Sequence, residues 1–544
     1  MLSGTASAPA YGRAFIPIAD VRPRVFTRVA IANRGEIAVR IIRALREMSV
    51  TSILLHSSAD ATSLAASLAD ERVCIGPPPA AQSYLDIGAV VQGALDAGAD
   101  GLHPGYGFLS ENAAFATAVG DAGITFIGPR PEVIARLGDK VAARRAVVDA
   151  GVPVMPGSDG AIEGREEAME VARSVGLPVI VKAAGGGGGR GMRVVHELSE
   201  LPEAIERAST EALSAFGNAA VYVERYFERP RHIEVQVLGD LDEVIHLGER
   251  ECTIQRRHQK LIEESPSPVV DRALRERLCA AAVDVARAVG YTNAGTVEFL
   301  LQEGQFHFLE VNTRIQVEHP VTELVTGVDL VCAQLRLAAG EPLTMRQSQI
   351  HQRGNAIEVR INAEDPYAQF LPSPGRVRTF VPAQGPGVRV DTAIRSGDPI
   401  PREYDSLICK LVVLAPDRLH AIARMRMALH ETVISGVPTA LDYYHWVLGT
   451  EEFRTGAFST RFVTDHPPVV PPATALASAA LAGALRLHRD ARAIGAIRGR
   501  RRNAGPEDLP ERDRRVWRQA GQQPTPAPYP WDRVSPRAGG DHEW

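Results

Sequence analysis

The hydrophobic positions of residues 25–139 alternate between short, continuous apolar runs and longer stretches with helical spacing. Short runs such as RVAIA, SILLHS and ITFIG are typical of buried strands. The stretch RGEIAVRIIRALREM instead repeats its apolar positions in the manner of an amphipathic helix. This alternation predicts an N-terminal doubly wound parallel α/β domain.

A second pattern begins after residue 140. A strand-like apolar run ends in Lys182 and leads into five consecutive glycines, 185–189, before another short apolar run. Consecutive glycines cost backbone entropy and pack nothing, but their N–H groups can close over an anion such as a polyphosphate. A flexible linker is the alternative, although linkers seldom separate two strands. Because the sequence has no GxxxxGK[ST] motif, a P-loop is excluded.

Residues 296–322 contain the most informative pattern. Two apolar runs flank a short polar turn with Gly304, which predicts a β-hairpin, and each run carries one carboxylate, Glu298 and Glu310. A three-residue loop would place the two carboxylates on one face. A two-residue loop would place them on opposite faces, because side chains alternate along a strand.

On a shared face the two carboxylates would need a cation. At about 4 Å they repel by about 4 kcal/mol with an effective dielectric near 20, and Mg²⁺ or Mn²⁺ would remove that repulsion. Asn312 would add a carbonyl oxygen on the same face, and Arg314 and Glu318 would set a cation and a candidate general base beside the metal. A solvated hairpin with ordinary surface acids is the alternative.

Other polar side chains stand in or beside strand-like runs. Glu224 in VYVERYF can accept hydrogen bonds from an adenine or a ribose, whereas His232 in PRHIEVQV is equally well explained as a core histidine. Residues 249–260 are dense in hydrogen-bond donors directly after a strand. A solvated charged run is the usual interpretation of such a stretch, but this one is unusually donor-specific.

Length, charge and cysteine content limit the classes of protein to which the chain can belong. A chain of 544 residues should form several domains, and a net charge of −5 gives no general attraction to nucleic acid or membrane. The five cysteines form no CxxC pair, and no apolar run approaches the length of a membrane span, so we expect a cytoplasmic protein. Residues 1–24 lack the apolar core of a secretory signal and are expected to be a disordered extension or a misplaced start, with an organellar presequence as the weaker alternative.

Lysine is scarce in this chain. Of the 60 lysines and arginines, only four are lysines: Lys140, Lys182, Lys260 and Lys410. Lysine is a compact point charge suited to phosphate, whereas arginine is a planar fork. The bias predicts that lysine occurs where a guanidinium cannot serve.

Eight motifs together resemble biotin carboxylase, an ATP-grasp family, from about residue 25 to residue 462: IANRGEIAVRI, HPGYGFLSEN, VKAAGGGGGRGMRVV, RRHQK, EVNTRIQVEHPVTE, RINAEDP, FLPSPG and YDSLICK. The resemblance implies an N-terminal α/β domain (25–139), an ATP-grasp domain with a glycine-rich lid (140–345) and a C-terminal α+β domain (350–465). It also implies MgATP-dependent carboxylation of biotin by bicarbonate through carboxyphosphate.

The resemblance also implies roles for residues at the matching positions. The ATP phosphates would be contacted by Lys140, Lys182, Gly188 and Gly189. The base and the ribose would be contacted by Glu224, Arg225, Tyr226, Phe227 and His232. The phosphates and bicarbonate would be contacted by His258, Gln259 and Lys260. The metal would be held by Glu298, Glu310 and Asn312. Bicarbonate would be bound by Arg314, Gln316 and the backbone of Val317, with Glu318 taking its proton and Arg360 stabilising charge on the biotin ureido oxygen.

Residues 466–544 have no counterpart in this resemblance. They form an Ala-, Arg- and Pro-rich tail, expected to be partly disordered, and they carry no Met-Lys-Met biotinylation target. Biotin is therefore expected on a separate carrier protein, unless the chain is truncated before a biotinyl domain. A carboxyltransferase subunit and a homodimer or larger complex are also expected.

Three alternatives stay open at this point. Acetyl-CoA or propionyl-CoA is the expected final acceptor, with a pyruvate or urea carboxylase as the alternative. Another ATP-grasp ligase would share the lid and the carboxylate pair but not RRHQK together with RIQVEHP and RINAEDP. A non-catalytic scaffold subunit would be expected to have lost some of the residues named above.

Overall fold

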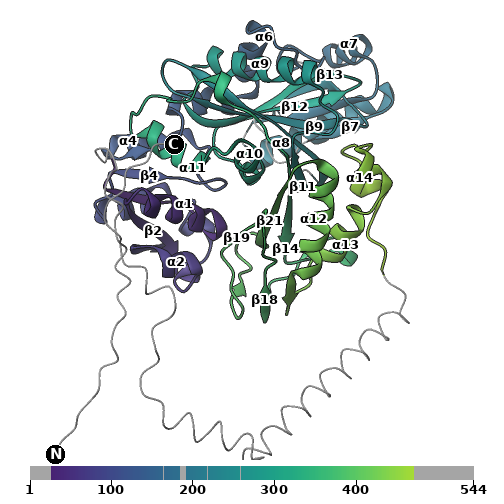
Figure 1. Ribbon diagram of the computed structural model, residues 1–544. Helices are drawn as coiled ribbons and strands as arrows, with labels where there is room; N and C mark the ends of the chain where they lie inside the picture. Colours follow the sequence, from purple (N-terminus) through teal and green to yellow (C-terminus); the bar gives the residue numbers. More distant parts are fainter. Residues whose placement is uncertain (1–25, 163, 184–191, 217, 258, 471–544) are drawn as a thin grey trace, which may run out of the picture. The chain divides into compact units, whose positions relative to one another are not determined.

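The computed structural model describes residues 26–470 apart from 163, 184–191, 217 and 258 (Figure 1). The chain divides into two compact units, Met1–Pro468 and Val469–Trp544. Within the described ranges, no helix combines the length and the apolar character needed to cross a membrane.

The N-terminal region is a five-stranded parallel sheet, as the alternating pattern predicts. Its strand order is β3 (Glu71–Gly76), β2 (Thr51–Ser57), β1 (Arg28–Ile31), β4 (Gly101–His103) and β5 (Thr125–Phe126). Helix α1 (Gly35–Glu47) follows β1 and buries its apolar positions, among them Ile37, Ile41 and Leu45. The further helices of this region are α2 (Leu64–Leu68), α3 (Ile87–Asp96), α4 (Ala113–Asp121) and α5 (Pro131–Gly138).

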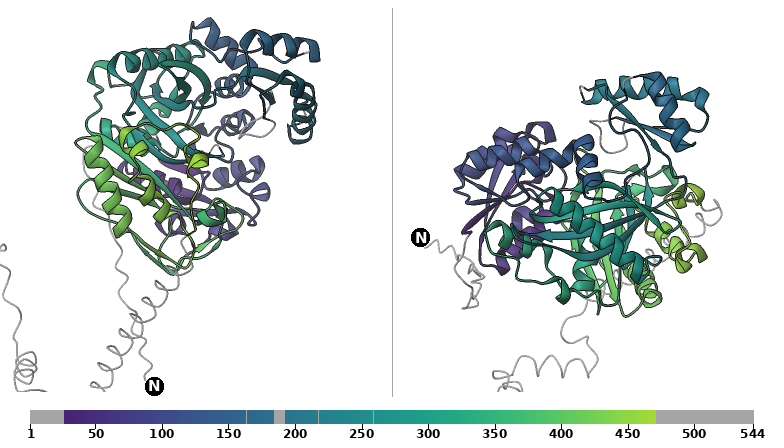
Figure 2. Two further views of the ribbon diagram at one scale, coloured as in Figure 1. Left: turned by 90° about the vertical axis from the view of Figure 1, so that its right-hand side faces the viewer. Right: turned by 90° about the horizontal axis from the view of Figure 1, so that it is seen from above.

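A small antiparallel sheet flanks the glycine run. It consists of β7 (Arg193–Val195), β6 (Val179–Ala183) and β8 (Val221–Arg225), and helices α7 (Arg165–Val175) and α8 (Leu201–Phe216) pack on it (Figure 2). Val179 and Val181 point into the shared core because alternate residues of a strand face the same side. Strand β6 therefore contains Lys182, as predicted, and the glycine run itself lies outside the described residues.

The largest sheet has eight antiparallel strands and spans most of the remaining chain. Its order is β13 (Gln305–Asn312), β12 (Asn293–Gln302), β9 (Arg231–Gly239), β10 (Val244–Arg256), β11 (Gln259–Ser265), β14 (Asn355–Asn362), β21 (Leu407–Ala415) and β19 (Val388–Thr392). Strand β11 pairs with β14, so the sheet continues across the boundary expected between residues 345 and 350.

Helices pack on this sheet. They are α6 (Lys140–Asp149), α9 (Arg272–Ala288), α10 (His319–Thr326), α11 (Leu330–Ala338), α12 (Arg418–Glu431), α13 (Leu441–Val447), α14 (Glu451–Thr455) and α15 (Phe462–Asp465). Buried aliphatic residues of β14, β21 and α12 share one core with the aromatic residues of α13. The sheet thereby gives a rigid base to side chains that come from distant parts of the sequence.

Candidate active site

The predicted hairpin is formed by β12 and β13, but its register has an unexpected origin. The turn has only two residues, Glu303 and Gly304, both with positive φ (52° and 74°), as a type I′ turn requires. A two-residue turn alone would have separated the carboxylates. A β-bulge between Glu298 and Phe299 shifts the register by one residue, so Glu298 lies opposite Glu310. The carboxylates share a face because of the bulge, not because of the loop length.

Glu298 is surrounded by donors. Its Oε1 accepts hydrogen bonds from Asn312 Nδ2 (2.8 Å), Gln316 Nε2 (2.8 Å) and Lys260 Nζ (3.0 Å). Its Oε2 lies 2.7 Å from His232 Nε2. Burial alone would raise the pKa of this carboxyl, but Lys260 and His232 hold the pKa well below its usual value. His232 therefore lies beside the predicted metal ligands and is buried.

Glu310 has the opposite environment. Within the described residues its carboxylate has no hydrogen bond or ion pair. Part of the Glu310 side chain is exposed to solvent. Its pKa is nevertheless raised, by loss of hydration and then by the negative charge of Glu298, while Lys140 acts in the other direction. A divalent cation would supply the positive charge that this carboxylate lacks. The carboxylate and amide oxygens of Glu298, Glu310 and Asn312 are ligands that suit Mg²⁺ or Mn²⁺, so the donor set fits the predicted metal.

Lys260 is the cation at the centre of the site. Its ammonium group lies 2.5 Å from Glu234, 2.5 Å from Glu318 and 3.0 Å from Glu298. Burial would lower its pKa, but these three carboxylates raise the pKa well above the usual value. A single point charge therefore connects β9, β11, β12 and the start of α10.

Glu318 is held from both sides. Its Oε1 pairs with Lys260, and its Oε2 accepts a hydrogen bond of 2.8 Å from Arg360. Arg360 also donates to Glu263 (2.6 Å). Despite burial, Lys260 and Arg360 hold the pKa of Glu318 below its usual value, so the carboxylate is ionised at neutral pH. Glu263 differs, because burial raises its pKa to about 7 even though Arg360 opposes that shift.

The loop between β13 and α10 carries the predicted bicarbonate contacts. The Arg314 side chain donates to Glu111 (3.0 Å) and Asn312 (3.0 Å). The Gln316 amide accepts from Arg250 (2.9 Å). The structure thus brings the loop to the carboxylate pair, as predicted.

Glu234 and Glu263 were missed by the sequence interpretation, and Arg250 lies in the donor-dense stretch 249–260 but was given no role of its own. That stretch does not follow a strand, as expected, but is itself mostly strand, in β10 and the start of β11. Arg250 is fully buried and donates to Glu234, Gln236, Thr296, Gln316 and Thr322 at 2.6–3.1 Å. Glu234 and Glu263 are charged residues inside strand-like runs with apolar positions, HIEVQV and KLIEES. That is the signal that identified Glu298 and Glu310, and it applies equally here.

The residues predicted to contact the nucleotide are only partly brought together. Glu224 pairs with Lys182 (2.6 Å) and Arg144 (3.2 Å). Lys140 begins α6 close enough to Glu310 for the two charges to interact. Arg225, Tyr226 and Phe227 instead line a hollow of about 540 Å³ whose walls do not include Glu224 or His232. Gln259 is exposed at the start of β11, and Gly188, Gly189 and His258 lie outside the described residues.

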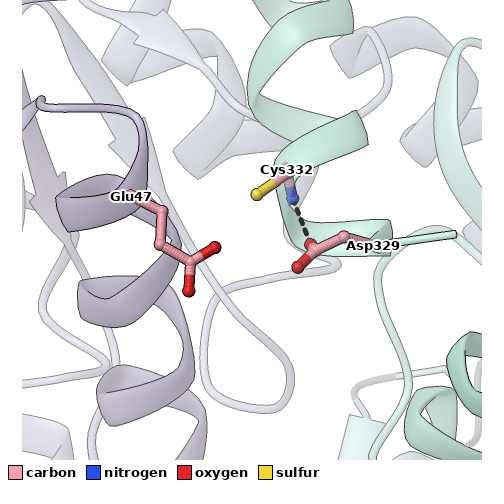
Figure 3. Close-up of side chains that lie close together, drawn as sticks. All are labelled: Glu47, Asp329 and Cys332. Atoms are coloured by element: carbon pink, nitrogen blue, oxygen red, sulfur yellow. Dashed lines mark hydrogen bonds between the residues drawn. The ribbon is translucent and has the colours of Figure 1, made fainter. Parts of the chain in front are cut away.

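One further group of ligand-type side chains lies away from this site. Glu47, Asp329 and Cys332 approach one another where α1 meets α11 (Figure 3). Asp329 caps α11 by accepting from the Cys332 N–H (2.7 Å), and it pairs with Arg40 (2.7 Å). Burial and the charge of Asp329 raise the pKa of the Cys332 thiol to about 12. Helix capping and the ion pair with Arg40 account for the position of Asp329 in this group.

Three family models match the chain in succession. They are "Biotin carboxylase, N-terminal domain" over residues 25–134, "Carbamoyl-phosphate synthase L chain, ATP binding domain" over 139–346, and "Biotin carboxylase C-terminal domain" over 358–465. The N-terminal parallel domain, ATP-grasp domain and C-terminal domain expected from the resemblance are thereby confirmed.

Individual relatives agree with the family models. Biotin carboxylase from Nostoc sp. is 53% identical over 442 residues, which are 81% of this chain and 99% of the relative. A crystal structure of a biotin carboxylase–β,γ-ATP complex from Campylobacter jejuni has a TM-score of 0.79 at 46% identity and covers 81% of this chain and 99% of its own.

A second solved structure is that of the biotin carboxylase domain dimer of 2-oxoglutarate carboxylase from Hydrogenobacter thermophilus, in complex with MgADP, ADP and bicarbonate. It has a TM-score of 0.79 at 45% identity and covers 82% of this chain and 100% of its own. This chain belongs to the biotin carboxylase family of ATP-dependent ligases.

Proposed function

We propose that this chain catalyses the MgATP- and bicarbonate-dependent carboxylation of biotin, the first half-reaction of a biotin-dependent carboxylase. The products are ADP, phosphate and N-carboxybiotin. The observation that carries the proposal is the position of Glu318, which is held between Lys260 and Arg360 and which Lys260 links to Glu298 of the carboxylate pair. A candidate base, an anion-binding lysine and a metal-type carboxylate pair thus occupy one small region.

The carboxylates and the lysine serve the phosphoryl transfer. Glu298, Glu310 and Asn312 would hold a divalent cation, and that cation would neutralise negative charge on the ATP phosphates. Lys260, Arg314 and Gln316 bind and orient bicarbonate, which is a poor nucleophile until it is deprotonated or oriented. Lys140 and Lys182, with Gly188 and Gly189, hold the phosphates. Glu224 to Phe227, His232, His258 and Gln259 complete the nucleotide contacts.

The proton of bicarbonate passes to Glu318. Without substrate this carboxylate is a weak base, because two cations hold its pKa low. An anion bound at Lys260 neutralises part of that positive charge and raises the proton affinity of Glu318. The base therefore becomes effective when bicarbonate is bound, and the carboxyphosphate that forms releases CO₂ beside biotin.

Arg360 serves the second step. Its guanidinium is already oriented by Glu263 and Glu318 and is nearly buried (12% exposed). A preoriented cation at low solvent exposure stabilises the negative charge that develops on the ureido oxygen of biotin. This assignment separates Arg360 from Glu318, which acts on bicarbonate.

We further infer the partners of the reaction from the family to which the chain belongs. Biotin arrives on a carrier protein, and a separate carboxyltransferase passes the carboxyl group to an acyl-CoA such as acetyl-CoA or propionyl-CoA. The solved 2-oxoglutarate carboxylase domain is named as a dimer, which supports a homodimer or a larger complex for this chain. We place the reaction in the cytoplasm. We propose the same domain bounds as the resemblance implies: the N-terminal domain at 25–139, the ATP-grasp domain at 140–345 and the C-terminal domain at 350–465. Residues 1–24 and 466–544 are extensions.

The test is ADP release by the purified chain with Mg²⁺ and ATP, with bicarbonate and free biotin varied separately. We expect ADP release that depends on bicarbonate and increases with biotin, together with incorporation of ¹⁴C from bicarbonate into carboxybiotin. The Glu318→Gln variant is the matched control, since it keeps the shape of the side chain but removes its charge. ADP release that is indifferent to bicarbonate in the unaltered chain would overturn the proposal.

A further inference from the structure

We propose that Lys410 is a positioning residue for the bicarbonate site, because its hydrogen bond to the carbonyl of Val317 holds the loop of residues 314–318 in place. The inference rests on the function proposed above and extends it to a residue outside the site. Of the four lysines in the chain, Lys410 is the one to which that function gives no role.

The contacts of Lys410 join three parts of the chain. Its Nζ, on strand β21, lies 2.9 Å from the carbonyl oxygen of Val317 and 3.0 Å from Glu36 Oε1 on helix α1. Asp391 on β19 lies 3.7 Å away. The lysine side chain is fully buried (0% exposed), so water does not compete for its hydrogen atoms.

The loop itself depends on such anchors. Residues 313–318 connect β13 to α10 and belong to neither a helix nor a strand, so their carbonyls lack the regular partners of secondary structure. The carbonyl oxygen of Gln316 accepts from the His319 N–H (3.3 Å) and lies 2.7 Å from His319 Nδ1, and the carbonyl of Glu318 accepts from the Val321 N–H (3.3 Å). Lys410 binds the carbonyl between them, that of Val317, for which the described residues provide no backbone donor. The Val317 carbonyl therefore depends on the buried side chain of Lys410.

These contacts fix the side chains that the reaction needs. Gln316, on one side of Val317, contacts Glu298, and Glu318, on the other side, contacts Lys260 and Arg360. A rotation of the 317–318 peptide would move the Glu318 carboxylate and the backbone of Val317 together. The hydrogen bond from Lys410 opposes that rotation.

The surroundings favour lysine over arginine at this position. Glu36 also accepts a hydrogen bond from Tyr106, and Asp391 pairs with Arg389 (2.7 Å). One ammonium group can donate in three directions from a single atom, whereas the guanidinium is a planar fork. The compact charge therefore bridges an acid of α1 and a carbonyl of the loop.

The competing explanation is that Lys410 only joins the N-terminal and C-terminal regions through an ion pair. Variants can separate the two explanations. Lys410→Met removes the donor, and the double variant Lys410→Met/Glu36→Gln also removes the acid that would be left unpaired, which protects folding. Arg418→Met is the matched control, because it breaks another buried ion pair, with Glu264 (2.6 Å), that does not touch the loop.

The measurements are KM for bicarbonate, KM for ATP, the thermal midpoint, and binding of ¹³C-bicarbonate in the presence of MgADP. For the double variant we expect KM and the dissociation constant for bicarbonate to rise about tenfold or more, the size expected for loss of a hydrogen bond to a charged donor. KM for ATP should change less than about twofold, which is smaller than the change expected from the loss of one hydrogen bond. Arg418→Met should lower the thermal midpoint without weakening bicarbonate binding.

A double variant that folds and binds bicarbonate as the unaltered chain does would overturn the positioning role. Equal weakening of bicarbonate and ATP would also overturn it, because a purely structural contact has that effect. The proposed function is tested separately, by bicarbonate-dependent ADP release in the unaltered chain. The ¹³C-bicarbonate measurement does not require turnover. It therefore tests the positioning role of Lys410 even if the unaltered chain shows no bicarbonate-dependent ADP release.

Discussion

Arg360→Met should separate ATP cleavage from biotin carboxylation. The substitution removes a guanidinium that donates to Glu318 (2.8 Å) and Glu263 (2.6 Å) and leaves an unbranched side chain in its place. We expect bicarbonate-dependent ADP release to persist at a reduced rate while carboxybiotin formation falls by a much larger factor. The reason is that the two steps depend on different cations.

The magnitudes follow from the distances. At an effective dielectric of about 20, a unit charge at 2.8 Å interacts with Glu318 by about 6 kcal/mol, and Lys260 at 2.5 Å by about 7 kcal/mol. The variant thus loses less than half of the paired positive charge around Glu318, which stays ionised and able to accept a proton.

The carboxyl group left behind in the variant should not unfold the protein. Burial already raises the pKa of Glu263 to about 7, and loss of Arg360 raises it further, so Glu263 becomes neutral instead of remaining an unpaired buried charge. The biotin step has no comparable substitute for Arg360. Loss of one preorganised donor commonly costs a factor of about 10² to 10³ in rate.

The assay measures ADP and ¹⁴C-carboxybiotin in the same reaction for Arg360→Met and for Glu318→Gln. Glu318→Gln should depress both products, because carboxyphosphate does not form without the base. Arg418→Met serves as the control for lost stability. If Arg360→Met and Glu318→Gln lose the two products in the same proportion, the separation of the steps is refuted, although the enzyme assignment could stand.

Three further outcomes are expected. Glu310→Gln should raise the Mg²⁺ concentration needed for half-maximal ADP release by about tenfold or more, the loss typical even of outer-sphere partners; an unchanged Mg²⁺ titration would refute the metal role. Lys260→Arg should fold but lose most bicarbonate-dependent activity, since a planar fork cannot contact three carboxylates at one point, and near-normal turnover would count against this reasoning. For Glu263, the folded-state pKa of about 7 lies above the ordinary value of 4.5, so its contribution to stability is full below pH 4.5 and is lost as the pH rises through 7. Urea unfolding of Glu263→Gln should show a smaller fall in stability over that window, and parallel pH curves for the two proteins would contradict the shift.

The sequence predicts the hairpin and its two acids but not the reason that they face each other. Apolar runs and Gly304 suffice to place the strands and the turn. The bulge at Glu298 adds one residue to one strand, and such an insertion has no periodic signature, because it interrupts the period. The side-chain pattern is therefore consistent with either register.

Non-local pairing is the second feature that periodicity cannot supply. Glu263 lies directly opposite Glu358 because β11 pairs with β14, nearly a hundred residues later in the chain, and Arg360 follows on the same face. Both oxygens of Glu358 lack a hydrogen-bond partner among the described residues, and burial raises its pKa well above the usual value. Each acid is visible in the sequence as a charge in an apolar run, but its partner is not.

The scarcity of lysine has a broader cause than phosphate binding. Lys182, Lys260 and Lys410 each contact a buried glutamate, and Lys260 and Lys410 each connect three or more separate segments through one nitrogen atom. When several acceptors surround one point, they need N–H groups that all leave from a single nitrogen atom. Among cationic side chains, only the lysine ammonium group has three N–H groups on one nitrogen. An arginine-rich chain therefore retains lysine where carboxylates and carbonyls converge, and the bicarbonate site proposed above lies beside the most crowded of these points, Lys260.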